Sequence, residues 1–506
     1  MEKALSIQSG LDFVIGQEIQ NDEKRGPEKS LTEKLSIIFK NISVEPVFFL
    51  YQLPSVMAAL SIQNLNLEKA CRVNLQMNTE TCDALTMRNA SGYNATEEIQ
   101  VQKLVASMNA WKNIIQSLLP LTMLLLLGSY SDRHKKRKLC IQLPIIGEMC
   151  ATLSFIACTY FFYELPMECN AIADSVPPAL FGGWFTFYMG VYSYISVMST
   201  LETRTLRIGA TNIADKVSFT IGIALSGVLY RILGFYGVFG LAIILYIIGI
   251  TYTIFCLKEV PRDDVPKRQE HFLKDFFNFK HIMGTIRVAF KKGDRNRKKR
   301  VLGIMVLVMV IIGPVHGEIS VSYLFVRYKF GWNEVDYSLF HTFIVVMHMI
   351  GTFFSLAFFS RFLKLDDTVL GMISNFSKFL ACFVFAFAPN SKIFYLGAVV
   401  EMLNGTSFIA MRSIISKLVP PDELGKINSL FGVCEALMPL IYGPMYSLTY
   451  KMTINWLPGF FYILGGVLTL PSVFIFLWLY TEHKRDEREL LERKEIEEKK
   501  PFTQAT

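Results

Sequence analysis

Long apolar stretches alternate with short polar segments along most of the 506-residue chain. Each stretch is about 20 residues long or more, the length that a helix needs to cross the hydrocarbon core of a membrane. We therefore predict an all-α membrane protein with twelve transmembrane helices, at about 43–62, 104–127, 139–164, 179–200, 212–233, 236–257, 301–326, 337–362, 367–388, 392–413, 427–449 and 457–480.

The polar segments divide these helices into two groups of six. Residues 1–42 form a polar N-terminal tail, 258–300 a basic linker and 481–506 a charged C-terminal tail. Because Lys and Arg gather on the cytoplasmic side of membrane proteins, we expect all three to be cytoplasmic. The halves are then 43–257, with a long outer loop at 63–103, and 301–480. Part of the linker is expected to lie on the membrane surface as an amphipathic helix.

Composition narrows the class of protein. Hydrophobic residues make up 52% of the chain, and the net charge of +8 comes from basic residues in loops of one side, so it does not indicate nucleic-acid binding. We find no zinc-protease motif, nucleophile elbow or phosphate-binding glycine loop. The sequence therefore predicts no enzyme activity, no metal and no cofactor apart from protons as a coupling ion. The expected partners are the lipid bilayer and a small molecule.

The predicted outer segments carry features of an extracellular or lumenal surface. Asn89 and Asn94 each begin an Asn-x-Ser/Thr sequon and are predicted glycosylation sites. Three cysteines lie in outer segments, and a disulfide among them is expected, with the pairing left open: Cys71, Cys82 and Cys169.

A short charged loop at 128–138 separates the second and third predicted helices. It follows the pattern Gly-x-x-x-Asp-Arg-x-Gly-Arg-Arg, with lysine in place of the second glycine. An aspartate beside a helix N-terminus is favoured by the helix dipole, and the cations hold the loop in the cytoplasm. In this loop the chain resembles the major facilitator superfamily, which implies two six-helix halves that rock around a central site. The matching residues are Gly128, Asp132, Arg133, Lys136 and Arg137.

Three further stretches resemble solute carrier family 46, the branch that contains the proton-coupled folate transporter: SVEPVFFL, RTLRIGATNIADKVSFTIG and MRSIISKLVPPDELGKINSLFG. The resemblance implies a proton-coupling role for His316 and a substrate- and proton-binding role for Arg412. The family's proton-coupling glutamate falls on Asn212, and Asp215 one helical turn later is the acid that could replace it.

Ionisable residues inside membrane helices are costly and mark functional candidates. A histidine changes charge in the pH range of acidic compartments, and an arginine can hold an anion through two hydrogen bonds. The alternatives are a neutral, hydrogen-bonded His316 and an Arg412 that only anchors a helix end. We interpret Lys112 and Lys378 as structural. The remaining proton- or substrate-pathway candidates are Glu148, Glu318, Glu401 and Glu435, with His341 and His348 also buried.

The C-terminal tail contains the pattern Asp/Glu-x-x-x-Leu-Leu, formed by Asp486, Leu490 and Leu491. Sorting adaptors read such an acidic dileucine signal as an address to endosomes and lysosomes. We therefore expect a multi-pass protein of the plasma membrane or the endolysosomal membrane, with sorting adaptors as partners of the tail.

These observations predict a proton-coupled transporter that moves a small organic anion into the cytosol by alternating access. The mixture of cations and acids in the predicted helices favours a polar or anionic organic solute, and the resemblance to family 46 implies a folate-like, muropeptide-like or cyclic-dinucleotide-like one. Two alternatives stay open. One is a carrier that works without protons, which Asn212 favours. The other is a membrane sensor or scaffold that keeps the fold without transporting.

Overall fold

The computed structural model describes residues 43–89, 91–134, 136–198, 201–258, 296–363, 365–419 and 421–498, which form helices joined by short turns and irregular segments. The predicted N-terminal tail and the amphipathic helix of the linker lie outside these residues. The α-helices are α3 (Glu45–Lys69), α4 (Thr79–Met87), α5 (Ala95–His134), α6 (Arg137–Tyr160), α7 (Met167–Leu180), α8 (Gly183–Met198), α9 (Leu201–Phe255), α12 (Arg297–Phe330), α13 (Glu334–Phe354), α14 (Asp367–Phe387), α15 (Ser391–Val400), α16 (Gly405–Leu418), α17 (Pro421–Thr453) and α18 (Phe460–Glu498).

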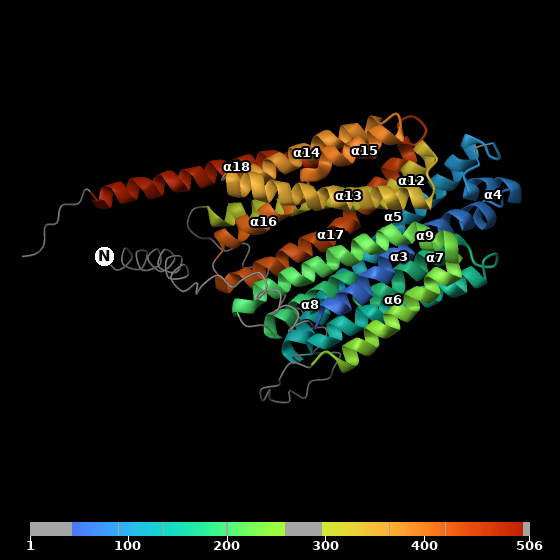
Figure 1. Cartoon of the computed structure of the whole chain (residues 1–506), viewed down its shortest axis with the longest axis horizontal. Helices are drawn as coiled ribbons and strands as arrows, with labels where there is room; N and C mark the ends of the chain where they lie inside the picture. The colour runs from blue at the N-terminus through green and yellow to red at the C-terminus, as the bar shows by residue number, and fades with distance from the viewer. Residues whose placement is uncertain are drawn as a thin grey trace, which may run out of the picture.

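These helices cross the bundle twelve times in the described part of the chain, which confirms the predicted fold class (Figure 1). The pairs α7–α8 and α15–α16 each make one crossing from two pieces. By contrast, α9 makes two crossings that meet at Gly234, whose φ of 63° is a left-handed conformation that glycine adopts without steric cost. Within the described residues, eight helical segments are long and apolar enough to span a membrane by length and composition.

The two halves repeat the same packing. In the first half α3 packs along α9, and α6 packs on α8 and α9. In the second half the corresponding pairs are α12 with α17, and α14 with α16 and α18. The halves meet where α5 packs on α17 and α9 packs on α13. Such a repeat places the interface between the halves at the centre of the molecule.

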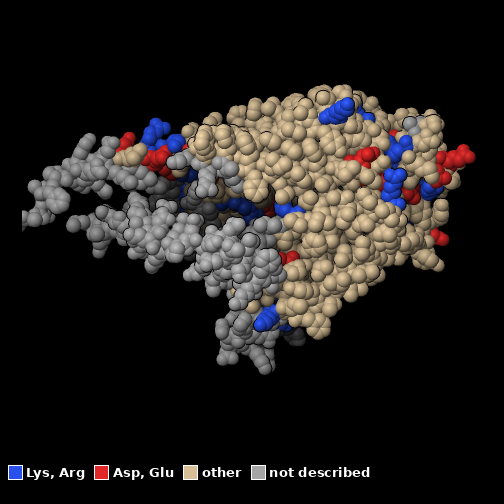
Figure 2. Space-filling model, in the orientation of Figure 1, with Lys and Arg blue, Asp and Glu red and all other residues tan. Residues whose placement is uncertain are grey.

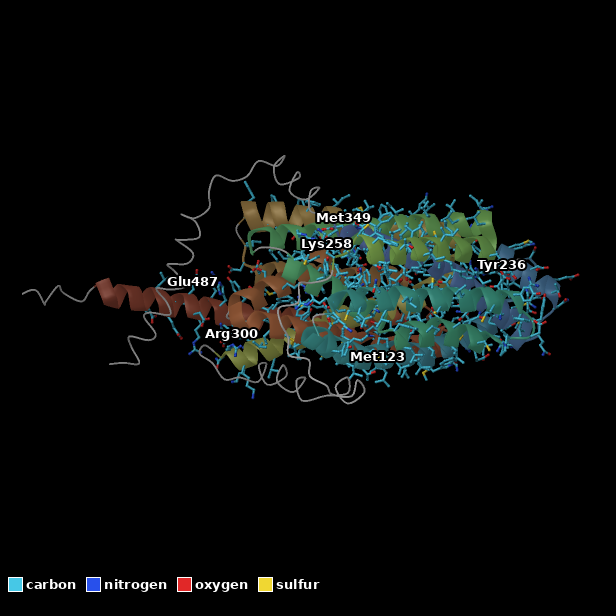
Figure 3. All side chains as sticks on the ribbon, turned by 90° about the horizontal axis from the view of Figure 1, so that it is seen from below. Met123, Tyr236, Lys258, Arg300, Met349 and Glu487 are labelled. Carbon is cyan, nitrogen blue, oxygen red and sulfur yellow. A yellow bond between two sulfur atoms is a disulfide. The ribbon has the colours of Figure 1, made fainter. Side chains whose placement is uncertain are left out.

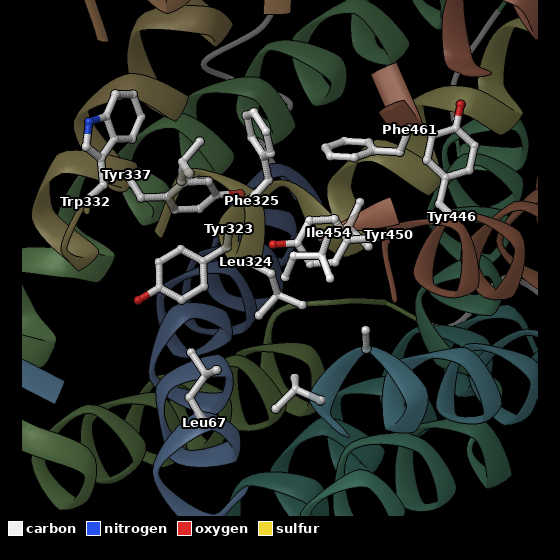
Figure 4. Packing of buried hydrophobic residues seen from close by; sticks show 14 of the residues in the cluster. Leu67, Tyr323, Leu324, Phe325, Trp332, Tyr337, Tyr446, Tyr450, Ile454 and Phe461 are labelled. Carbon is white, nitrogen blue, oxygen red and sulfur yellow. The ribbon is translucent and has the colours of Figure 1, made fainter. Parts of the chain in front are cut away.

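The apolar cores show where the halves are joined. At the end of the bundle that carries α4, one cluster includes Val105 of the first half and Tyr323 and Phe461 of the second, and we call it the shared core (Figure 4). Of the two other clusters, one holds only residues of the first half and the other only residues of the second. The halves are thus packed together at the α4 end. We call the opposite end, where α18 leaves the bundle, the tail end.

Several helices are longer than their apolar stretches predicted. The first continues through a π-helical turn to Asn74, and α5 begins at Ala95, so the predicted outer loop 63–103 is largely helical. The predicted loop 165–177 lies mostly in α7, and α12 begins at Arg297, inside the predicted linker. Hydropathy identifies only the apolar part of a helix, which lies in the hydrocarbon core of the membrane. The polar turns at either end are stabilised by tertiary packing, which a sequence does not show.

The charged segment 128–138 is also mostly helical, which corrects its prediction as a loop. It runs to His134 within α5, and α6 begins at Arg137, so Asp132 lies in the last turn of α5. The Arg137 guanidinium donates to the Ser193 carbonyl at 2.9 Å, and the Lys138 ammonium donates to the Leu257 carbonyl at 3.0 Å. The cations therefore tie the start of α6 to the ends of two neighbouring crossings.

The segment Gly313–Glu318 lies inside α12, which is helical on both sides of Pro314. Gly313 and Gly317 lie against the rings of Tyr442 and Tyr446 of α17, where a side chain on either glycine would collide with the ring. Small residues four apart let two membrane helices approach closely. The two glycines thus allow α12 to pack closely on α17.

Candidate functional site

A cluster of three charged side chains lies inside the second half. The Lys378 ammonium on α14 donates to the Glu318 carboxylate on α12 at 2.6 Å and to the Glu401 carboxylate at 2.9 Å. The side chains of Lys378, Glu401 and Glu318 are 3%, 6% and 12% exposed. We call these three residues the lysine-bridged cluster. It brings together two predicted site residues through a lysine that we had interpreted as structural.

The local structure of the tenth crossing brings Glu401 into this cluster. α15 ends at Val400, a single 3₁₀ turn covers Glu401–Leu403, and α16 starts at Gly405. Such a turn within a helix often marks a functional hinge. The Asn404 amide donates to the Glu401 carboxylate at 3.0 Å, and the His348 imidazole of α13 lies 3.7 Å from it. Four crossings thus contribute polar groups to one place.

Arg412 and Glu435 form a second site, nearer the tail end. The Arg412 guanidinium donates to the Glu435 carboxylate at 3.2 Å, and its side chain is 52% exposed. It lies over the rings of Phe408 and Phe431, at 5.0 and 4.9 Å from their centroids. A guanidinium that lies over two aromatic rings, and that has one carboxylate partner among the described residues, retains donors for an anion with an apolar body.

Asp215 of α9 belongs to the first half. Its carboxylate accepts a hydrogen bond from the Tyr188 hydroxyl of α8 at 2.7 Å, and the exposed Lys216 ammonium lies 3.6 Å away. Asn212 lies in the same helix, and its side chain is not among those described. Asn212 and Asp215 are therefore both in α9, and the Asp215 carboxylate is bound by one tyrosine hydroxyl.

His316 does not join the lysine-bridged cluster. Its ring lies 6.1 Å from the ring of Trp184 on α8, across the interface between the halves. Glu318, two residues later, points into the second half instead, as expected for positions that lie on different faces of a helix. The predicted histidine and the predicted acid therefore belong to separate sites. Figure 2 shows Lys and Arg side chains in a hollow between the halves.

The first half contains a simpler ion pair. The Lys112 ammonium of α5 donates to the Asp174 carboxylate of α7 at 2.8 Å, and the Gln116 amide donates to the same oxygen at 3.0 Å. The sequence did not indicate Asp174 as a partner of Lys112, because Asp174 lies between the predicted helices 139–164 and 179–200. Glu148 of α6 lies in the same half, and no hydrogen bond to its carboxylate is present among the described residues.

The α4 end contains polar contacts that sequence reasoning missed. The Arg327 guanidinium of α12 donates to the Leu85 carbonyl at 2.8 Å, and the Tyr323 hydroxyl donates to Asn64 of α3 at 2.5 Å. The Arg88 guanidinium bonds both the Glu98 carboxylate and the Arg327 carbonyl. These buried bonds join the halves beside the shared core. Nothing in the apolar pattern indicated that Arg327 would be buried.

The predicted outer features also lie at this end. Cys71 and Cys82 form a disulfide, and Cys169 is a free thiol, which settles the pairing in the structure. Asn89 and Asn94 are exposed, and the Asn89 side chain accepts hydrogen bonds from Ser91 of its own sequon. Among the described residues, no group of three or more His, Cys, Asp and Glu side chains is placed to hold a metal ion.

Comparisons with known proteins agree on the family. The model of the Major Facilitator Superfamily matches residues 99–443. The lysosomal proton-coupled steroid conjugate and bile acid symporter SLC46A3 of Gallus gallus is 25% identical over 452 residues, which cover 87% of this chain and 94% of the relative. The probable peptidoglycan muropeptide transporter SLC46 of Drosophila melanogaster is 22% identical over 451 residues, which cover 87% and 85%. Distant homologues along most of the chain are thus members of solute carrier family 46.

Solved structures of the same fold are less similar in sequence. The human organic anion transporter MFSD10 superimposes with a TM-score of 0.55 at 13% identity, covering 86% of this chain and 98% of that one. A peptide transporter POT in complex with sulfate gives a TM-score of 0.57 at 13% identity, with 87% and 94% covered. At this identity the likeness shows the fold alone.

Proposed function

The chain belongs to the major facilitator superfamily, a family of transporters and not of enzymes, and we propose that it carries a small organic anion across a membrane together with protons. The single observation that carries this proposal is the lysine-bridged cluster, in which two carboxylates share one ammonium. With all three groups ionised, the cluster has one negative charge too many, and one proton removes it. A buried site whose charge depends on a single proton is suited to coupling.

The arrangement of the halves supports alternating access. The shared core and the bonds of Arg327 close the α4 end, whereas Arg412 is exposed nearer the tail end. We propose that the tail end is cytoplasmic and that the structure represents the state open to the cytosol. In the opposite state the bonds between Tyr323 and Asn64 would break, and the α4 end would open to the lumen or exterior.

Arg412 is the residue that we propose binds the anion. Its half-exposed guanidinium and the neighbouring rings of Phe408 and Phe431 suit an anion with an apolar or aromatic body. Folate-like, muropeptide-like and cyclic-dinucleotide-like solutes have this character. One relative is named as a symporter of steroid conjugates and bile acids, which adds two classes of candidate solute. Another is named as a probable muropeptide transporter, which agrees with one of the classes above. We propose that the cargo belongs to one of these classes.

Uptake into proteoliposomes tests this function directly. Purified protein would be offered a labelled bile acid, a steroid sulfate, folate, muramyl dipeptide and a cyclic dinucleotide, at about one pH unit below and one above the usual histidine pKa of about 6.5. We expect uptake of one class to be faster on the acidic side. Equal uptake at both values would favour a carrier without proton coupling, and no uptake of any solute would favour a sensor or scaffold.

Two substitutions separate the proton site from the anion site. Glu318→Gln keeps the size of the side chain but removes the surplus charge, so it should preserve exchange of labelled for unlabelled solute and abolish acid stimulation. Arg412→Ala should abolish both. His316→Ala serves as the comparison, because the resemblance to family 46 assigns coupling to this histidine. If His316→Ala flattens the pH profile and Glu318→Gln does not, the coupling site is at His316.

A further inference from the structure

The tail end of the molecule contains a contact between α12 and the part of α18 that extends from the bundle. The Arg300 guanidinium, near the start of α12, binds the Glu482 carboxylate at 2.9 Å and the Asp486 carboxylate at 2.5 and 3.0 Å. It also donates to the Glu482 carbonyl at 3.3 Å. Asn296 adds a contact to Glu482 at 3.4 Å. Figure 3 labels Arg300 at this end and Glu487 on the extended part of α18.

This contact is better built than an ordinary surface ion pair. The side chain of Arg300 is 9% exposed, and those of Glu482 and Asp486 are 16% and 14% exposed. A guanidinium that binds a carboxylate through two nitrogen atoms gives a strong and directional pair. By contrast, the pair of Arg485 with Glu489 on the same helix is 67% and 48% exposed. We call the contact of Arg300 with Glu482 and Asp486 the tail clamp.

The tail clamp occupies the acidic residue of the predicted sorting signal. Asp486 is the acid of the pattern that ends at Leu490 and Leu491, and the helix continues through both leucines to Glu498. The side chain of Leu491 is 56% exposed. A partner that reads the pattern through a basic patch and an apolar pocket finds a leucine accessible but the carboxylate already bound to Arg300.

We propose that Arg300 masks the acidic dileucine signal, so that a cytosolic sorting adaptor binds the tail only when the clamp opens. The adaptor's basic patch and Arg300 compete for the same Asp486 carboxylate. Because Arg300 belongs to the first helix of the second half, anything that moves α18 relative to α12 alters the accessibility of the signal. The proposal concerns sorting and does not depend on which solute is transported.

The test measures binding of the full-length protein, in lipid nanodiscs, to a purified clathrin adaptor core that binds acidic dileucine peptides. We expect Arg300→Gln to tighten binding about tenfold, equivalent to about 1.4 kcal/mol. Glu482→Gln leaves the pattern intact and removes one of the two carboxylates, so a smaller tightening is expected. Arg485→Gln is the matched control, since it removes the same charge from an exposed pair outside the clamp and should change binding little.

The double variant Leu490→Ala/Leu491→Ala completes the design. It should abolish adaptor binding both alone and in combination with Arg300→Gln, because the adaptor requires the leucines whether or not the tail clamp is closed. Binding that is unchanged by the leucine substitutions would overturn the proposal, and so would Arg300→Gln binding no tighter than wild type. If Arg300→Gln does not yield folded protein, Glu482→Gln and Arg485→Gln are compared instead. Tighter adaptor binding by Glu482→Gln than by Arg485→Gln supports the proposal, and equal binding by the two variants overturns it.

Discussion

Lys112 and Lys378 lie in opposite halves of the molecule and differ in the number of carboxylates that they neutralise. The Lys112 ammonium has one carboxylate partner, Asp174, at 2.8 Å, and the two side chains are 14% and 21% exposed. The Lys378 ammonium has two, Glu318 at 2.6 Å and Glu401 at 2.9 Å, and it is 3% exposed. A sequence shows two similar lysines in membrane helices, whereas the structure shows a balanced pair and an unbalanced cluster.

The number of carboxylates bound to each lysine indicates which of the two has a structural role. A balanced pair has no net charge when both of its groups are ionised, and this pair joins two helices of one half. An unbalanced cluster retains a negative charge that only a proton or another cation can remove, and leaving it buried is costly. We therefore assign the pair of Lys112 to packing and the cluster of Lys378 to coupling, and the substitutions below test that assignment by comparing the two lysines.

Lys378→Met should have the largest effect of these substitutions. It leaves two buried carboxylates without their cation, and breaking a buried ion pair from one side costs about 3–5 kcal/mol. We expect a sharp fall in the apparent melting temperature and in the monodisperse fraction after solubilisation. Lys378→Met/Glu318→Gln/Glu401→Gln should recover much of both. A single variant as stable as wild type would contradict the compensation that we assign to Lys378.

Lys112→Met should cost less, about 1.5–3 kcal/mol, because it leaves one carboxylate that is partly exposed and keeps the hydrogen bond from Gln116. The same thermal assay measures it. The control is Lys112→Met/Asp174→Leu, which removes both charges and should be close to wild type. Acid-stimulated uptake by the double variant should persist, and its loss would move the coupling role to the first half.

The two acids of the cluster should differ from each other by about 1 kcal/mol. Glu401 accepts hydrogen bonds from Lys378 and Asn404, whereas the strong contact of Glu318 is with Lys378 alone. Glu401→Gln should therefore lower the apparent melting temperature more than Glu318→Gln does. The reverse order would show that Glu318 is the structural member and Glu401 the better candidate for the mobile proton.

His348→Asn should have the smallest effect, below about 1 kcal/mol. Its imidazole lies 3.7 Å from the Glu401 carboxylate, too far for a strong hydrogen bond, and its side chain is 28% exposed. We expect a melting temperature close to that of wild type and retained acid stimulation. Loss of acid stimulation in this variant would include His348 in the proton site of the second half.

The apolar pattern by itself determined the twelve helices and the division into two halves, because a membrane requires each spanning segment to satisfy its own backbone hydrogen bonds within an apolar helix. It also selected Glu318 and Glu401, since an acid in such a segment is exceptional. It did not indicate Asp174 or Arg327, because both lie in stretches whose polar composition resembles loops.

Only the tertiary structure decided which charges act together. Glu318, Lys378 and Glu401 come from three helices, and the bonded partners are 60 and 23 positions apart along the chain. Two acids therefore share one lysine only because α12, α14 and the 3₁₀ turn at Glu401 pack around the same point. His316 is two residues from Glu318 in sequence but contacts the other half, since adjacent positions of a helix face different neighbours.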